Sequence, residues 1–170
     1  MTPAELRAKQ GPLREKFKYD PASAMVTLRA VGQLGADVTC RLIFPVPPQI
    51  AGLHPLTGGD GTKACSAEML LHALVGGAGV TMGAVSTAME IPIRAGTITA
   101  EGDVDFRGTL GVSREVPVGF QRIRLKFELN TDAPIEKIQK MVELIERYCV
   151  VYQTLKTSVD IKTEFSLEQK

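Results

Sequence analysis

The stretch from Ser66 to Glu90 constrains the fold most, because it combines a helix start with a long uncharged interior. Ser66 is a suitable N-cap residue, and Glu68 would lie in the first turn, where the helix dipole favours a carboxylate. Pro92 follows the run and cannot continue a helix. These features predict one helix of roughly 36 Å, which is long enough to cross a small domain.

The interior of this predicted helix is unusually rich in glycine. Its four glycines are Gly76, Gly77, Gly79 and Gly83. Each glycine costs up to about 1 kcal/mol relative to alanine, so close approach of another backbone is expected to offset that cost. A membrane span is the alternative, but the run is mostly Ala and Gly, contains His72 and lacks terminal Trp or Tyr. We therefore expect a buried central helix and no membrane partner.

The composition is that of one globular domain spanning residues 1–170, in which 1–22 form an N-terminal helical extension. Lys and Arg number 20 against 19 Asp and Glu, so the charge favours no nucleic-acid partner. The polar N-terminus lacks the apolar core of a signal peptide, and the three cysteines form no even disulfide set. A cytoplasmic location with reduced thiols is expected.

The remaining chain alternates between strands and helices. A polar helix is expected over 3–19, interrupted at Gly11-Pro12. Predicted strands, from alternating polar and apolar residues, cover Met25–Val31, Ala36–Phe44, Thr97–Arg107, Val118–Asn130 and Ser158–Phe165. The first two flank a turn at 32–35, and the next two form a long hairpin. The class is therefore α+β with antiparallel sheets.

A second helix is predicted after Thr131–Pro134. Its apolar residues recur at intervals of three and four, at Ile135, Ile138, Val142, Ile145 and Cys149. The helix is expected to break near Cys149, and the chain then runs through Tyr152 to the last strand.

Two segments resemble one protein family. GGDGTKACSAEMLLHALVGGAGVTMGAV is similar to the central-helix signature of the OsmC/Ohr family, the osmotically inducible and organic hydroperoxide resistance proteins. ERYCVVYQTL resembles the second, helix-ending cysteine segment of that family, and the hairpin with Glu101-Gly102 between them also fits. The resemblance covers roughly residues 24–166.

The resemblance implies an intertwined homodimer with two central helices at its core. It also implies thiol-dependent reduction of small organic hydroperoxides. A cysteine on the central helix attacks the peroxide and becomes a sulfenic acid, a second cysteine condenses with it, and a dithiol reductant reopens the disulfide. A Glu near the helix start and an Arg from the N-terminal part hold the first thiolate. No cofactor is implied beyond the reductant.

This chain departs from the family pattern at the first cysteine, where Gly77 stands. The second cysteine is matched by Cys149, although Val150 replaces the following proline. Glu68 matches an acidic position of the helix start, and Arg29 is the arginine best placed in the sequence. Cys149 is either a reactive thiol or a core residue of the apolar stripe.

Cys65 is a further thiol candidate, because it precedes the central helix and lies near Lys63, and both features favour a thiolate. It lies about 18 Å along the helix from Gly77. Glu68 and His72 share a helix face, but even with His54 nearby they suggest no metal site. The catalytic candidates are therefore Cys149, Glu68 and Cys65.

Three functions remain open. The first is a hydroperoxide reductase that uses Cys149, with or without Cys65. The second is a binding protein that has lost the chemistry and takes a small apolar ligand in a dimer-interface pocket, lined by Gly77, Met69 and Tyr152. The third is another thiol enzyme, acting on a thioester or an activated acyl group.

Overall fold

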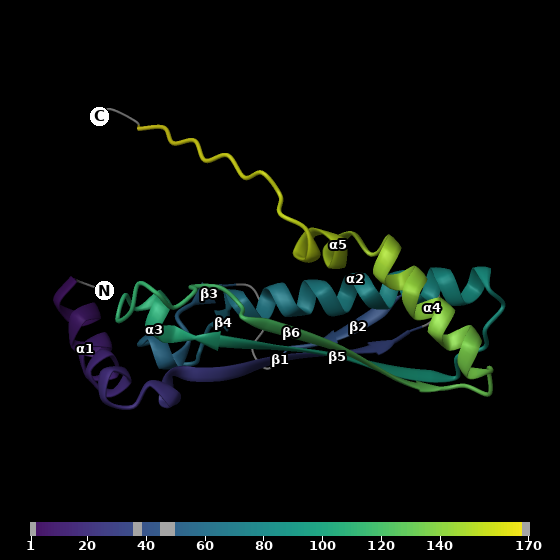
Figure 1. Cartoon of the computed structure of the whole chain (residues 1–170), viewed down its shortest axis with the longest axis horizontal. Coiled ribbons are helices and arrows are strands. Elements are labelled where there is room, and N and C mark those ends of the chain that lie inside the picture. The colour runs from purple at the N-terminus through teal and green to yellow at the C-terminus, as the bar shows by residue number, and fades with distance from the viewer. Residues whose placement is uncertain (1–2, 36–38, 45–49, 168–170) are drawn as a thin grey trace.

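In the computed structural model, which describes residues 3–35, 39–44 and 50–167, one antiparallel sheet carries a long helix along one face (Figure 1). The sheet has the strand order β2-β1-β5-β6. Its strands are β1 (Met25–Leu34), β2 (Cys40–Ile43), β5 (Ala95–Asp105) and β6 (Arg122–Asn130). The predicted α+β class with an antiparallel sheet is confirmed.

The long hairpin between β5 and β6 forms as predicted. Ala100 pairs with Leu125, and the inner faces of both strands turn towards the long helix. Strand β1 runs on to Leu34, so the turn expected at 32–35 starts later than predicted. Gly32 explains the extension, because it pairs with Leu42 on β2 and with Ile98 on β5. The expected strand start at 36–38 lies outside the described residues.

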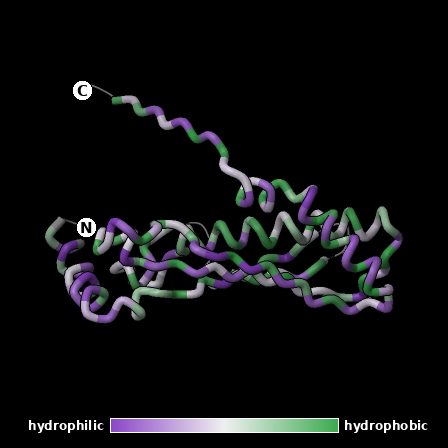
Figure 2. Tube along the Cα trace, in the orientation of Figure 1, coloured by the Kyte–Doolittle hydropathy of each residue, from purple (hydrophilic) through white to green (hydrophobic). Residues whose placement is uncertain are grey.

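The long helix, α2, covers Ser66–Ala88, in agreement with the sequence prediction. Its N-cap residue is Cys65 rather than Ser66, and the Cys65 side chain makes no capping hydrogen bond. The helix contributes Leu71, Leu74, Val75, Ala78 and Met82 to the core, and most of its length has hydrophobic colours in Figure 2. It is apolar and long enough to span a membrane, and 44% of its most apolar 18-residue window is buried inside the fold.

The glycines Gly76, Gly77 and Gly79 of α2 face side chains, so the expected approach of another backbone is wrong. A Cβ atom at Gly79 would lie 2.5 Å from Cys40 Sγ and 2.6 Å from Cys40 Cβ. A Cβ atom at Gly76 would instead lie 3.6 Å from Leu42, an ordinary contact distance. The close packing of β2 on the helix therefore depends on Gly79.

The N-terminal helix α1 (Pro3–Tyr19) is continuous, so the predicted interruption at Gly11-Pro12 was wrong. A proline inside a helix costs about 3 kcal/mol, because it removes one hydrogen bond and crowds the preceding turn. Phe17 is fully buried and Leu13 is half-buried. A buried Phe side chain contributes roughly 1.5–3 kcal/mol, so packing of the second half of α1 offsets the proline.

The second predicted helix, α4 (Ile135–Tyr148), packs on α2 and ends at Cys149 as expected. The chain then forms another helix, α5 (Val150–Lys156). Residues 158–167 are extended and exposed and form no strand, which corrects the prediction of a last strand at Ser158–Phe165. Its alternating pattern is real, but no neighbouring strand within the same chain supplies hydrogen bonds.

Short elements close the end of the sheet near the start of α2. They are the 3-10 turns Pro21–Ala24 and Pro55–Thr57, the parallel pair β3 (Ala51–Gly52) and β4 (Ala64–Cys65), and the one-turn helix α3 (Phe106–Thr109). α1 packs against the turn at Pro55–Thr57, where Gln10 Nε2 donates to the Thr57 carbonyl at 3.0 Å.

Replacing Gly79 by alanine should destabilise the fold by about 1–3 kcal/mol, because the new methyl group overlaps Cys40. The matched control is Gly76→Ala on the same helix. There the methyl group meets no close atom, and the loss of glycine entropy should stabilise the protein by about 0.5–1 kcal/mol. Urea unfolding measures both values, and equal effects of the two substitutions would contradict the packing argument.

Candidate functional site

Cys149 occupies the junction of two helices beneath the surface. It ends α4 and is the N-cap residue of α5, and its side chain has no exposed surface. The backbone N–H of Tyr152 donates to Cys149 Sγ at 3.4 Å. The sulfur therefore acts as a helix cap, which explains why the chain changes direction at this residue.

Gly77 faces Cys149 directly across the contact of α2 with α5. A Cβ atom at position 77 would lie 3.1 Å from Cys149 Sγ and 3.1 Å from Val151 Cγ2. In a disulfide the sulfurs are about 2.0 Å apart and the Cβ atoms about 3.8 Å apart, which puts each Cβ atom about 3 Å from the partner sulfur. The position has the spacing of a disulfide pair, but only one sulfur is present.

Cys40 lies on another side of α2 from Cys149. Successive helix residues are about 100° apart, so Gly77 and Gly79 point in nearly opposite directions. Cys149 contacts the first glycine and Cys40 the second, which places the helix between the two sulfurs. Cys40 Sγ donates weakly to the Val75 carbonyl at 3.9 Å, and burial raises the pKa of its thiol.

Cys65 and Glu68 remain near the start of α2, away from Cys149. Glu68 precedes Gly77 by nine residues, or about 13 Å along the helix axis, and Cys65 precedes it by twelve. All three cysteines are free. The structure therefore does not bring the three catalytic candidates, Cys149, Glu68 and Cys65, into one cluster.

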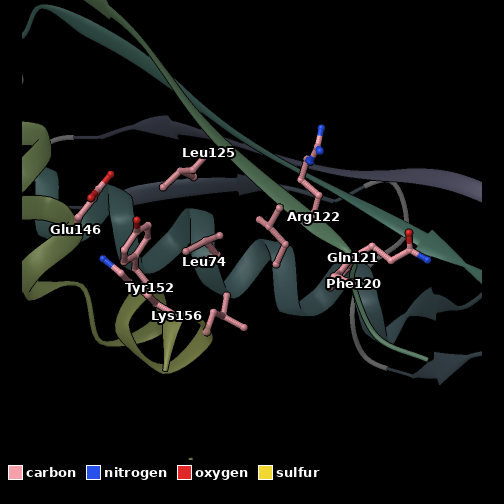
Figure 3. A pocket seen from close by; sticks show the side chains of 10 residues that line it. Leu74, Phe120, Gln121, Arg122, Leu125, Glu146, Tyr152 and Lys156 are labelled. Carbon is pink, nitrogen blue, oxygen red and sulfur yellow. The ribbon is translucent and has the colours of Figure 1, made fainter. Parts of the chain in front are cut away.

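A cavity of about 410 Å³ lies beside the Cys149 junction, between β6, α2 and the C-terminal helices (Figure 3). Its lining residues are Leu74, Phe120, Gln121, Arg122, Ile123, Leu125, Glu146, Tyr152, Leu155 and Lys156. Tyr152 was a predicted pocket residue. Gly77 and Met69 do not line this cavity, because the side of α2 at position 77 is occupied by Cys149 and Val151.

Polar groups lie at both ends of the cavity, with Glu146, Tyr152 and Lys156 at one end and Gln121 and Arg122 at the other (Figure 3). Lys156 Nζ lies 5.8 Å from the centre of the Tyr152 ring. Burial and then the Glu146 carboxylate raise the pKa of the Tyr152 phenol, so the hydroxyl is protonated at neutral pH. Apolar side chains lie between these ends, with Leu74 on α2 and Leu125 on β6. Such a site suits a small molecule that combines an apolar body with polar groups.

Sequence reasoning missed most of these lining residues. They come from four elements, and their spacing in each element is the ordinary spacing of a core face. The half-buried alternation of β6, with Ile123 and Leu125 inward, was visible. The part of the wall formed by α5 was not predicted, because this segment was expected to be a link to a last strand.

A second cavity, of about 400 Å³, contains Cys65 at the start of α2. His54 also lines it, and its ring stacks on Phe106 with centroids 5.0 Å apart. Burial lowers the pKa of His54, and the Glu68 carboxylate opposes that shift. The described residues contain no group of three or more potential metal ligands.

Arg29, the candidate partner of a thiolate, lies on the opposite face of the sheet from α2. Its Nε is 3.8 Å from Glu101 Oε1, and both side chains are substantially exposed. Arg124 and Lys126 share this solvated face, as expected for alternate residues of a strand. Arg29 therefore cannot reach Cys149 in this arrangement.

The fold and the cysteine-containing helix junction define a class, that of α+β proteins with the OsmC-like fold. A similar structure is that of an OsmC-like hydroperoxide resistance protein from Jannaschia sp. CCS1. Its TM-score is 0.62 and its identity 14%, with 86% of this chain and 97% of that chain covered. The OsmC-like protein of Mycoplasma pneumoniae has a TM-score of 0.53 and 16% identity, with 79% and 86% covered.

A family model described as OsmC-like protein matches residues 59–164, more than half of the sequence. The chain therefore belongs to the OsmC-like protein family. Comparison with curated protein sequences gave no match. The predicted family is confirmed at this level.

Replacing Gly77 by cysteine should create a disulfide with Cys149 under mild oxidation, because the Cβ position is already about 3 Å from the sulfur. The oxidised variant should show two free thiols instead of four by thiol titration in denaturant. Gly76→Cys is the matched control, since position 76 faces Leu42 and should keep four free thiols. A failure of Gly77→Cys to cross-link would contradict the described geometry.

Proposed function

We propose that this protein binds small organic molecules of the hydroperoxide and alcohol class without reducing them by a two-thiol cycle. The observation that carries the proposal is the pairing of Cys149 with Gly77. A two-thiol cycle needs an attacking sulfur and a resolving sulfur in contact. Here one member of the pair is a hydrogen atom, and the helix separates Cys149 from Cys40.

The cavity beside Tyr152 supplies the binding site. Its volume of about 410 Å³ falls within the range of small-ligand pockets. The apolar side chains would hold a hydrocarbon body, and the phenol of Tyr152, whose O–H is hydrogen-bonded to Glu146, can accept from a ligand hydroxyl or hydroperoxyl group. The ligand would lie beside the Cys149 junction, and the proposed role is to sequester such molecules in the cytoplasm.

The wild-type protein should bind cumyl alcohol but should not consume cumene hydroperoxide in the presence of a dithiol. Calorimetry measures the first property, and peroxide titration measures the second. Leu155→Trp should weaken binding at least tenfold, because the larger ring fills the cavity from α5. The control Leu167→Trp places the same ring in the exposed C-terminal segment and should leave affinity unchanged.

Gly77→Cys should restore peroxide consumption if the family geometry is intact, and Cys149→Ser in that background should remove its disulfide-forming step. The binding proposal fails if the wild-type protein does not bind cumyl alcohol, or if Leu155→Trp and Leu167→Trp bind it equally well.

A second candidate is reduction by Cys149 alone, which the N–H of Tyr152 directed at the sulfur favours. Cys149 would attack the O–O bond, giving a sulfenic acid and an alcohol, and an external dithiol would reduce the sulfenic acid. The complete burial of the thiol opposes this reading. The same assay decides, because turnover by wild type that is lost in Cys149→Ser would establish it.

We also propose that the protein is an intertwined homodimer. The C-terminal segment supports this, since its alternate apolar residues are exposed in the single chain and the segment projects away from the fold (Figure 1). These residues are Val159, Ile161, Phe165 and Leu167. β6 is an edge strand with one unpaired side. Addition of the C-terminal segment of a second copy as a strand would cover this edge and the apolar residues of the segment.

Light scattering with size-exclusion chromatography should therefore report a dimer for the full chain. The double substitution Ile161→Asp and Phe165→Asp should shift the protein towards monomer, because charges replace two of the residues that the partner would bury. Tyr19→Asp changes an equally exposed aromatic residue at the other end of the chain and serves as the control. A wild-type monomer would overturn the dimer proposal.

A further inference from the structure

His72 is a buried histidine that the proposed function does not use. Its side chain lies on α2 and is 2% exposed. Nδ1 lies 2.8 Å from the carbonyl oxygen of Glu68, and Nε2 lies 2.9 Å from the carbonyl oxygen of Ile43 on β2. The ring also stacks on Phe44, with centroids 4.0 Å apart. His72 is thus the polar link between the long helix and the end of an edge strand.

Both partners of the ring are hydrogen-bond acceptors. A neutral imidazole has one N–H and one lone pair, so it can donate to only one of two carbonyls and turns its lone pair towards the other. The imidazolium form has two N–H groups and satisfies both. At less than 3 Å the choice matters, because a carbonyl oxygen that faces the ring lone pair is repelled and loses its hydrogen bond from the ring.

His54 provides a contrast within the same chain. Its Nδ1 accepts a hydrogen bond from the backbone N–H of Leu56 at 3.1 Å, so that nitrogen carries no proton. The surroundings of His54 therefore select the neutral ring, whereas those of His72 offer two acceptors and no donor. The two histidines of the sequence therefore differ in their hydrogen-bond partners.

We propose that protonation of His72 clamps β2 onto α2, and that loss of the proton releases one of the two hydrogen bonds and loosens the strand. β2 has only four residues and pairs only with β1, so it depends on its contacts with the helix. It also carries Cys40, whose sulfur packs against Gly79. The clamp thereby makes the packing of β2 against one side of α2 depend on pH.

The charged and titratable groups around the clamp are few. α2 contributes Glu68, one turn before His72. β2 contributes Cys40 and the exposed Arg41, and β1 contributes Arg29 on the far face of the sheet. No ion pair between His72 and a described carboxylate is formed, so the two carbonyls are the partners that distinguish its protonation states.

Amide hydrogen exchange across pH 5.5–8, the range in which histidines ordinarily titrate, tests the clamp. Protection factors of the β2 amides are corrected for intrinsic exchange. They are then divided by those of the β5 amides, because β5 is paired with a strand on each side. In wild type this ratio should fall at least fivefold from pH 5.5 to pH 8. In His72→Gln it should be independent of pH, because the amide does not titrate.

Two further variants make the outcome decisive. His54→Gln should retain the wild-type pH dependence, since His54 takes no part in the clamp. His72→Phe keeps a ring to stack on Phe44 but donates to neither carbonyl, so β2 should be weakly protected at every pH. An equal pH dependence in wild type and His72→Gln, or its loss in His54→Gln, would overturn the proposal.

Discussion

The contact of α2 with sulfur atoms on its two sides determines how the rest of the molecule packs. Cys40 approaches from the sheet and Cys149 approaches from the C-terminal helices, and each meets a glycine. Without side chains at these positions, the sheet and the helices α4 and α5 can lie close to a single helix. Each glycine costs the helix about 1 kcal/mol relative to alanine, and the buried apolar surface on both sides offsets that loss.

The two glycine positions nevertheless differ in how closely a side chain there would approach its neighbours. At Gly79 the missing Cβ atom would lie 2.5 Å from Cys40 Sγ, which real side chains do not tolerate, so packing requires glycine there. At Gly77 the corresponding distance is 3.1 Å, close to that within a disulfide. A side chain at position 77 would also lie 3.1 Å from Val151 Cγ2, so Cys149 and Val151 would have to shift by a few tenths of an ångström to admit one. Glycine therefore eases the packing of α5 on α2, and it leaves Cys149 without a thiol opposite it.

The sequence allowed prediction of the elements whose signal is local. The hairpin of β5 and β6, the span of α2 and the break at Cys149 all followed from periodicity and helix-ending residues. Local rules failed where distant packing decides. α1 continues through Pro12 because Phe17 is buried against another part of the chain, and residues 158–167 form no strand because a strand needs a partner. That Gly77 faces Cys149 could be recognised only from the fold together with the resemblance to the OsmC/Ohr family.

The cavity could not be read from the sequence, since its walls come from separate elements, but one residue joins it to the thiol. The backbone N–H of Tyr152 holds the Cys149 sulfur, while the Tyr152 side chain lines the cavity. A ligand that shifts this side chain acts on the first turn of α5 and hence on the cap formed by the sulfur. Cys149 therefore has a structural role in the helix junction whether or not it reacts.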